Sequence, residues 1–128
     1  SAEKVSAYIH AGNKLAVIIG FTKNINDETG RNIAMQVAAM APVSVDKSDV
    51  SQELIDRELE IGRELARKEN KPENMIDKIA QGKLNKFYAE STLLNQEYVR
   101  EAKKTVAQYL AEADKDAKVT CFKRIALG

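Results

Sequence analysis

The strongest constraint on the fold of this chain lies in residues 51–89. Apolar residues recur there at helical spacing on both sides of the tripeptide Asn70-Lys71-Pro72, between many charged positions. This spacing predicts two amphipathic helices, which Ser51 and Pro72 are suited to begin. Because a turn this short requires the helices to lie antiparallel, and because each apolar stripe is narrow, we expect a helical hairpin that projects from the body of the protein.

Residues 4–10 and 15–21 predict a β-hairpin. In the first segment apolar and polar residues alternate, with Val5 and Ile9 on the apolar face, which is typical of a half-buried strand. The second segment is apolar throughout and predicts a strand that is covered on both faces. The residues between them include a glycine and an asparagine, which tolerate a positive φ, so we expect a tight turn there.

The rest of the chain predicts two further helices and a third strand. Residues 28–40 have helical spacing after Asp27, a suitable N-cap, and Thr105 can cap a last helix. Residues 119–127 predict a strand that returns to pair with the β-hairpin. The expected fold class is therefore α+β, with a small, mainly antiparallel three-stranded sheet packed with helices.

Composition excludes several classes of protein. The chain has 20 Lys and Arg against 19 Asp and Glu, a balance that gives no electrostatic case for direct binding of nucleic acid. No apolar run approaches the roughly 18 residues of a membrane span, and the first ten residues lack the pattern of a signal peptide. The single cysteine, Cys121, rules out an internal disulfide and fits a reducing compartment, so we expect a cytoplasmic protein.

The residues that could carry chemistry are few. A zinc site needs three or four converging ligands, but the chain has one histidine, His10, and one cysteine. Cysteine–histidine catalysis stays open at this point, because strands near both chain ends could bring His10 and Cys121 together. A structural or partner-contacting histidine is the favoured interpretation. We therefore expect no catalytic residue, no metal and no cofactor, and a protein that is not an enzyme.

The glycines are dispersed and match no phosphate-binding motif. Gly62 and Gly82 lie inside predicted helices, where a glycine costs about 1 kcal/mol relative to alanine. Two interpretations carry equal weight for both positions. The glycine is either simply tolerated, or it allows the two arms of the helical hairpin to approach closely.

Several segments, taken in order along the chain, share one resemblance. They are AYIHAGNKLAVII, residues 32–39 with Pro42 beyond them, Asp49-Val50-Ser51, Gly82-Lys83-Leu84, Lys86-Phe87-Tyr88, Leu93-Leu94 with Gln96, Lys104-Thr105-Val106, and residues 119–124. Together they resemble elongation factor Ts, the family of guanine-nucleotide exchange factors for elongation factor Tu. The resemblance covers essentially residues 5–126.

The resemblance implies an organisation and a contact site. Residues 1–48 and 90–128 are similar to the family's C-terminal, dimerisation-type core subdomain, and residues 49–89 to its inserted antiparallel coiled-coil arm. In the family this subdomain docks on elongation factor Tu, and the arm is implicated in homodimerisation or auxiliary contacts. The position that matches the family's contact-loop histidine is His10. The neighbouring contacts implied by the resemblance are Ala11, Gly12, Asn13 and Lys14.

The sequence also departs from the family. The family's Thr-Asp-Phe-Val motif, whose phenylalanine wedges into the nucleotide-binding domain of elongation factor Tu, does not occur here. We therefore expect a fragment that supplies docking affinity and promotes GDP release poorly by itself. Asn13-Lys14 stands where the family often has a small residue and arginine. The alternative is an autonomous protein-interaction or homodimerisation module with no exchange role.

Overall fold

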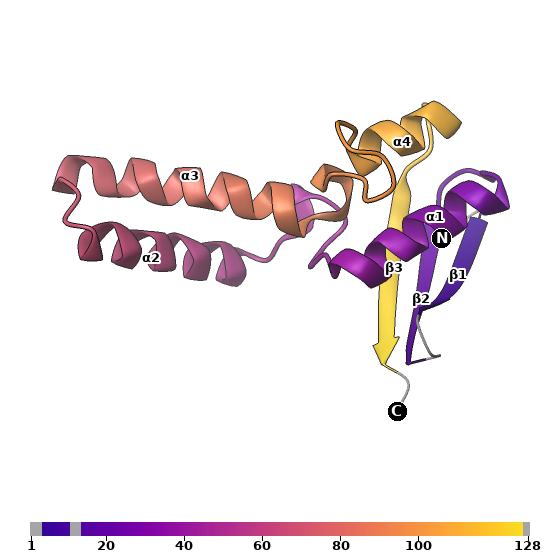
Figure 1. Ribbon diagram of the computed structural model, residues 1–128, viewed down its shortest axis with the longest axis horizontal. Helices are drawn as coiled ribbons and strands as arrows, with labels where there is room; N and C mark the ends of the chain where they lie inside the picture. The colour runs from indigo at the N-terminus through magenta and orange to yellow at the C-terminus, as the bar shows by residue number, and fades with distance from the viewer. Residues whose placement is uncertain (1–3, 11–13, 127–128) are drawn as a thin grey trace.

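The computed structural model describes residues 4–10 and 14–126, and its fold is α+β as predicted. Its elements, in order, are β1 (Lys4–His10), β2 (Leu15–Phe21), α1 (Asp27–Met40), the short 3-10 helix η1 (Lys47–Asp49), α2 (Gln52–Lys68), α3 (Glu73–Ser91), the short 3-10 helix η2 (Leu93–Asn95), α4 (Val106–Ala113) and β3 (Val119–Ala126). Figure 1 shows α2 and α3 side by side, projecting away from a body that contains the other elements.

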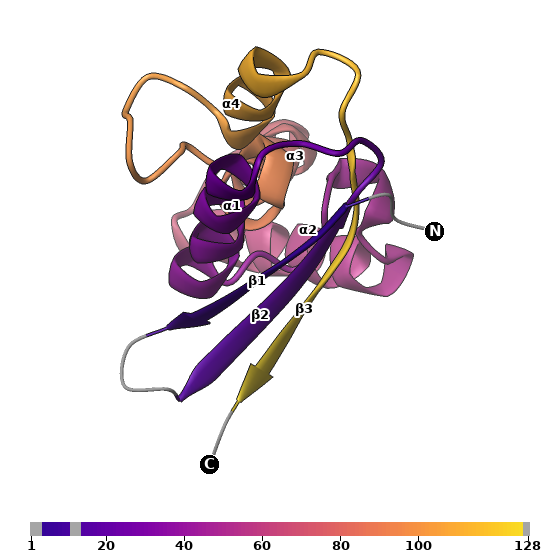
Figure 2. The ribbon, with the colours of Figure 1, turned by 90° about the vertical axis from the view of Figure 1, so that its right-hand side faces the viewer.

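The three strands form one antiparallel sheet in the order β1-β2-β3. The third strand pairs with β2, as predicted, so segments from both ends of the described chain lie in the sheet. Figure 2 shows α1 lying across one face of this sheet. The core lies between α1 and the sheet and extends to η2 and α4; its fully buried residues include Val17, Ile19, Phe21, Ile33, Val37, Leu93 and Val106.

The prediction that β2 is covered on both faces is wrong. Val17 and Ile19 are completely buried, whereas Ile18, which lies between them, is 45% exposed. Helices cover only one face of the sheet, and a continuous apolar run cannot indicate how many layers pack against a strand. The outer face of β2 therefore remains apolar and uncovered by any element that the structure describes.

Strand β1 buries its polar face. Ser6 is buried against α1, whereas Val5 and Ile9 are 60% and 58% exposed. Helix α1 and strand β1 approach each other closely at Ser6. A Cβ added to Gly30 of α1 would collide with the Ser6 hydroxyl. Only a small side chain fits beneath the helix at this point. The apolar face of β1 consequently lies on the outer side of the sheet, beside Ile18.

The helix boundaries largely agree with the predicted caps. Ser51 and Thr105 cap α2 and α4 as predicted, by accepting hydrogen bonds from the backbone amides of Leu54 and Gln108. Asp27 was predicted to cap α1, but the cap is Asn26, whose Oδ1 accepts from the Thr29 amide at 2.7 Å. Both side chains are suitable caps, and the backbone turns into the helix one residue earlier than the apolar spacing indicates.

The seam of the helical hairpin is built from small and aliphatic side chains. Its buried members are Gly62, Ala66, Ile76, Ala80 and Leu84. A Cβ on Gly62 would lie 3.0 Å from the Ala80 Cα, so this glycine does allow the arms to approach closely. Gly82 has no such neighbour within 4 Å and is simply tolerated. Among the described helices, none is long and apolar enough to cross a bilayer.

The base of the arm is tied to the body by backbone hydrogen bonds. The amides of Leu93 and Leu94 donate to the carbonyls of Ser44 and Val45, at 2.9 and 3.0 Å. Behind them Gln36 of α1, which is completely buried, donates to the Gln96 side chain and to the Glu97 carbonyl. These bonds satisfy polar groups that burial would otherwise leave unpaired. They hold the segments entering and leaving the arm against α1.

Candidate partner-binding surface

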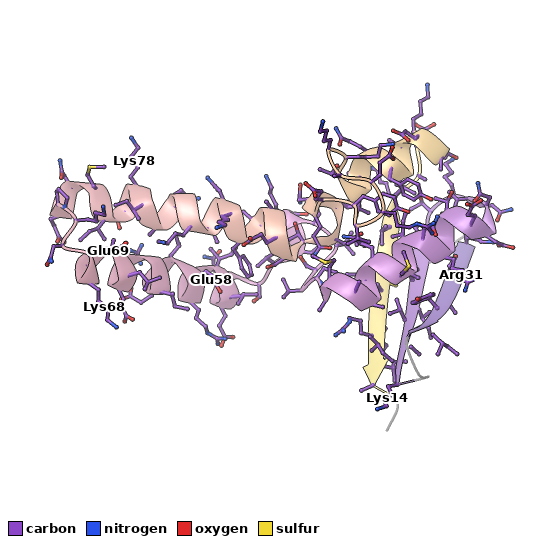
Figure 3. The ribbon with its side chains drawn as sticks, viewed as in Figure 1. Lys14, Arg31, Glu58, Lys68, Glu69 and Lys78 are labelled. Carbon is purple, nitrogen blue, oxygen red and sulfur yellow. The ribbon has the colours of Figure 1, made fainter. Side chains whose placement is uncertain are left out.

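Two of the predicted contact residues, His10 and Lys14, lie at one end of the sheet. His10 is the last residue of β1 and pairs with Leu15, the first residue of β2. Lys14, directly before Leu15, is exposed at this end (Figure 3). Ala11, Gly12 and Asn13 lie outside the described residues, as does the side chain of His10. The strand pairing therefore places His10 and Lys14 at the sheet end, and the contacts themselves remain a prediction.

The end of β3 lies beside this tip. Ala126 pairs with Leu15, Arg124 with Val17 and Lys123 with Ile18. The Arg124 guanidinium also donates to the Ala38 carbonyl near the end of α1, at 3.4 Å. The sequence predicted a strand over residues 119–127 but did not place Lys123 and Arg124 next to the end of β1 and the start of β2. The missing information was the register between β2 and β3, which no local pattern specifies.

His10 and Cys121 are not brought together. Cys121 pairs with Gly20, whereas His10 pairs with Leu15, five residues away along β2. Five residues of antiparallel strand span about 17 Å, far beyond hydrogen-bonding reach. This arrangement does not support cysteine–histidine catalysis. Within the described part of the chain, no group of three or more His, Cys, Asp and Glu residues is placed to hold a metal ion.

The outer face of the sheet is apolar and exposed. Strand pairing places nine side-chain positions on it, namely Val5, Ala7, Ile9, Ala16, Ile18, Gly20, Cys121, Lys123 and Ile125. Only one of them is charged, and a hollow of about 300 Å³ lies over Gly20 and Cys121. A contiguous apolar surface of this kind is typical of a protein–protein contact. Sequence reasoning missed this face because the run in β2 was interpreted as fully covered.

A second hollow, of about 410 Å³, lies beside α1 and is lined mostly by polar and charged residues. The Arg31 guanidinium lies over the Tyr8 ring at 5.8 Å, and Arg100 donates to Asn32 Oδ1 at 2.8 Å. Asp27 and Glu28 line the same hollow, so its charges are mixed. A hydrogen bond from Lys4, together with its charge, lowers the pKa of Asp27.

Other shifted groups lie in ion pairs or ring stacks. Burial, followed by the neighbouring Tyr109 hydroxyl, raises the pKa of Tyr98, and the two rings stack with centroids 4.3 Å apart. Hydrogen bonds to Glu101 and Glu112 raise the pKa of Lys104. These shifts keep each group in its ordinary protonation state at neutral pH. They are therefore features of packing and ion pairing rather than of a catalytic centre.

Comparison with known proteins gives a consistent result. A family model described as Elongation factor TS matches residues 1–128. The chain is 47% identical to elongation factor Ts of Christiangramia forsetii over 126 residues, which are 97% of this chain and 46% of that protein. It is 50% identical to elongation factor Ts of Porphyromonas gingivalis over 121 residues, covering 94% of this chain and 44% of that protein. For Aquifex aeolicus the identity is 40%, over 95% of this chain and 43% of the relative. The chain thus spans less than half the length of these relatives.

Proposed function

The chain belongs to the elongation factor Ts family of translation elongation factors, and we propose that it docks on elongation factor Tu as part of a guanine-nucleotide exchange factor. The observation that carries this proposal is the family match over residues 1–128, because it includes the hairpin to which the resemblance assigns the contact. In this proposal the protein promotes GDP release and GTP loading in the cytoplasm. It performs no covalent chemistry.

The mechanism is one of thermodynamic linkage. A factor that binds nucleotide-free elongation factor Tu more tightly than the GDP-bound form must weaken GDP binding by the same ratio. In this proposal the described strands position the residues that dock on elongation factor Tu. The pairing of β1 with β2 fixes the positions of His10, the last residue of β1, and of Lys14, which directly precedes β2. Because the Thr-Asp-Phe motif is absent from this chain, we propose that docking and nucleotide release are separable here.

A binding titration with purified elongation factor Tu tests the docking site. We expect His10→Ala to weaken binding about tenfold or more, the effect of truncating one of the few residues that dominate an interface. Asn24→Ala is the matched control, since Asn24 is exposed at the opposite end of the sheet. Equal affinities for the two variants would contradict the assignment of the contact to the hairpin tip.

The second candidate function is a homodimerisation module with no exchange role. The exposed apolar face of the sheet favours it, because Ile18 and Ile9 are 45% and 58% exposed there. Ile61 on the arm is 43% exposed. It is the position at which we test the homodimer through the arm that the resemblance implies. Light scattering on Ile18→Glu and Ile61→Glu separates the two surfaces. A chain that is monomeric before any substitution would remove this candidate.

A further inference from the structure

The sheet carries positive charge and no negative charge. The whole chain is nearly balanced, but residues 4–21 and 117–126, which contain the three strands and the turn between β1 and β2, include no Asp or Glu. Their charged residues are Lys4, Lys14, Lys118, Lys123 and Arg124. The acidic residues lie elsewhere, mainly on the arm and in the connections. Charge is therefore segregated within the molecule, which the overall net charge of +1 conceals.

Three of these cations lie on the half of the sheet nearer the turn between β1 and β2. Lys123 pairs with Ile18 and Arg124 with Val17, and Lys14 lies directly before Leu15. Four residues along β2 span about 14 Å, so the three backbone positions lie within one half of the sheet. Alternation along β3 places Lys123 on the outer face of the sheet and Arg124 on the face of α1. We call Lys14, Lys123 and Arg124 the basic sheet end.

None of the three has a carboxylate partner within the described residues. Lys4, at the other end of β1, forms an ion pair with Asp27, whereas among residues 4–10 and 14–126 no ion pair involves the basic sheet end. All three side chains belong to exposed residues. Arg124 donates to a backbone carbonyl, that of Ala38, and to no carboxylate in the part of the chain that the structure describes. These cations can therefore meet an anionic surface without first breaking an internal ion pair.

We propose that the basic sheet end binds an acidic protein surface, and that Lys14, Lys123 and Arg124 guide that partner onto the hairpin. The proposal rests on the proposed function, in which the partner is elongation factor Tu. Three cations in a chain of net charge +1 are too few for tight binding of nucleic acid, which commonly uses six to ten phosphate contacts. A protein surface with a few carboxylates matches this small region better.

Electrostatic guidance acts mainly on the rate of association. Complementary charges at the edge of an interface accelerate encounter at low salt, and the effect falls as ionic strength shortens the Debye length to about 3 Å at 1 M. A buried ion pair across the interface would instead affect mainly the dissociation rate. Because the basic sheet end is exposed, the proposal predicts an association rate that depends on salt, with little change in the dissociation rate.

Stopped-flow association with purified elongation factor Tu tests the proposal at low and high NaCl. The variant is Lys14→Glu with Lys123→Glu, which spares the Arg124 bond to α1. The matched control is Lys68→Glu with Lys78→Glu, which changes the net charge equally on exposed sites of the arm (Figure 3). We expect the sheet variant to associate about tenfold more slowly at low salt and the difference to shrink at high salt. The arm variant should associate at nearly the unchanged rate.

The outcomes are distinguishable. Equal slowing by both variants would overturn the proposal, since net charge alone would then account for the effect. Binding of the unchanged chain that does not depend on salt would also overturn it, while leaving the proposed function intact. No binding at any salt would overturn the proposed function and this inference with it. An RNA oligonucleotide that the unchanged chain binds and the sheet variant does not, with association to elongation factor Tu unaltered, would assign the cations to nucleic acid instead.

Discussion

Gly62 of α2 faces Ala80 of α3 so closely that a Cβ on the glycine would lie 3.0 Å from the Ala80 Cα and 3.2 Å from its Cβ. This contact fixes the spacing of the helical hairpin, because the backbone of α3 is the obstacle. A large side chain at Gly62 has no direction in which to relax without separating the helices.

We therefore expect Gly62→Leu to lower the free energy of unfolding by about 1–3 kcal/mol, the range typical of overpacking. Gly82→Ala is the matched control. The added methyl group meets nothing within 4 Å there, so the higher helix propensity of alanine should raise the free energy of unfolding by about 1 kcal/mol. Urea titration monitored by circular dichroism measures both changes. A stable Gly62→Leu variant would contradict the close approach.

The contact between Gly30 and Ser6 predicts a second pair of effects. Gly30→Ala should destabilise the protein by about 1–3 kcal/mol, because the new methyl group collides with the Ser6 side chain. Ser6→Gly should recover part of this loss when it is combined with Gly30→Ala, since it removes the obstacle. A double-mutant cycle measures the coupling. Additive effects in the cycle would mean that the two residues do not interact in this way.

The buried glutamine of α1 predicts a third effect. Gln36 is completely buried, donates to Gln96 and Glu97, and accepts from the Val99 amide at 2.9 Å. Replacement by leucine leaves these partners unpaired, so Gln36→Leu should cost about 2–3 kcal/mol of unfolding free energy. Gln81→Leu on the exposed side of the arm should change it by less than about 0.5 kcal/mol. Equal stability of the two variants would contradict the role of the network.

The pairing of Lys4 with Asp27 predicts a pH effect. The hydrogen bond from Lys4 lowers the pKa of Asp27 below its ordinary value of 3.8. A group whose pKa is lowered by folding contributes stability above its unfolded pKa, and the contribution disappears as pH falls through the folded value. In Lys4→Met we expect the pKa of Asp27, followed by NMR titration of its side-chain carboxyl, to rise toward 3.8. An unchanged pKa would show that the ion pair does not form in solution.

Periodicity was enough to predict which segments are helices and strands. Local sequence patterns predicted the caps Ser51 and Thr105 and the antiparallel arm. Each of these features depends on residues within one or two helical turns. The buried face of β1 was not readable, since hydrophobicity favours Val5 and Ile9 over Ser6. There the close packing of Gly30 decides the orientation, and that is a contact between segments distant in sequence.

The candidate site was predictable in part. The hairpin strands were predicted from periodicity and Lys14 as a contact from the family resemblance, whereas only the register of β3 on β2 brings Lys123 and Arg124 into the same half of the sheet. Register depends on the whole sheet and not on any one strand. The apolar outer face was missed for a related reason, because a run of apolar residues does not indicate whether one or two layers cover a strand.

We propose that this chain docks on elongation factor Tu without the Thr-Asp-Phe motif to which the resemblance assigns nucleotide release. The most direct test of this proposal is the rate at which labelled GDP leaves elongation factor Tu when this chain is saturating, with saturation established by the binding titration. The account predicts binding with GDP release far slower than that produced by a full-length elongation factor Ts. Release as fast as with the full-length factor would contradict it.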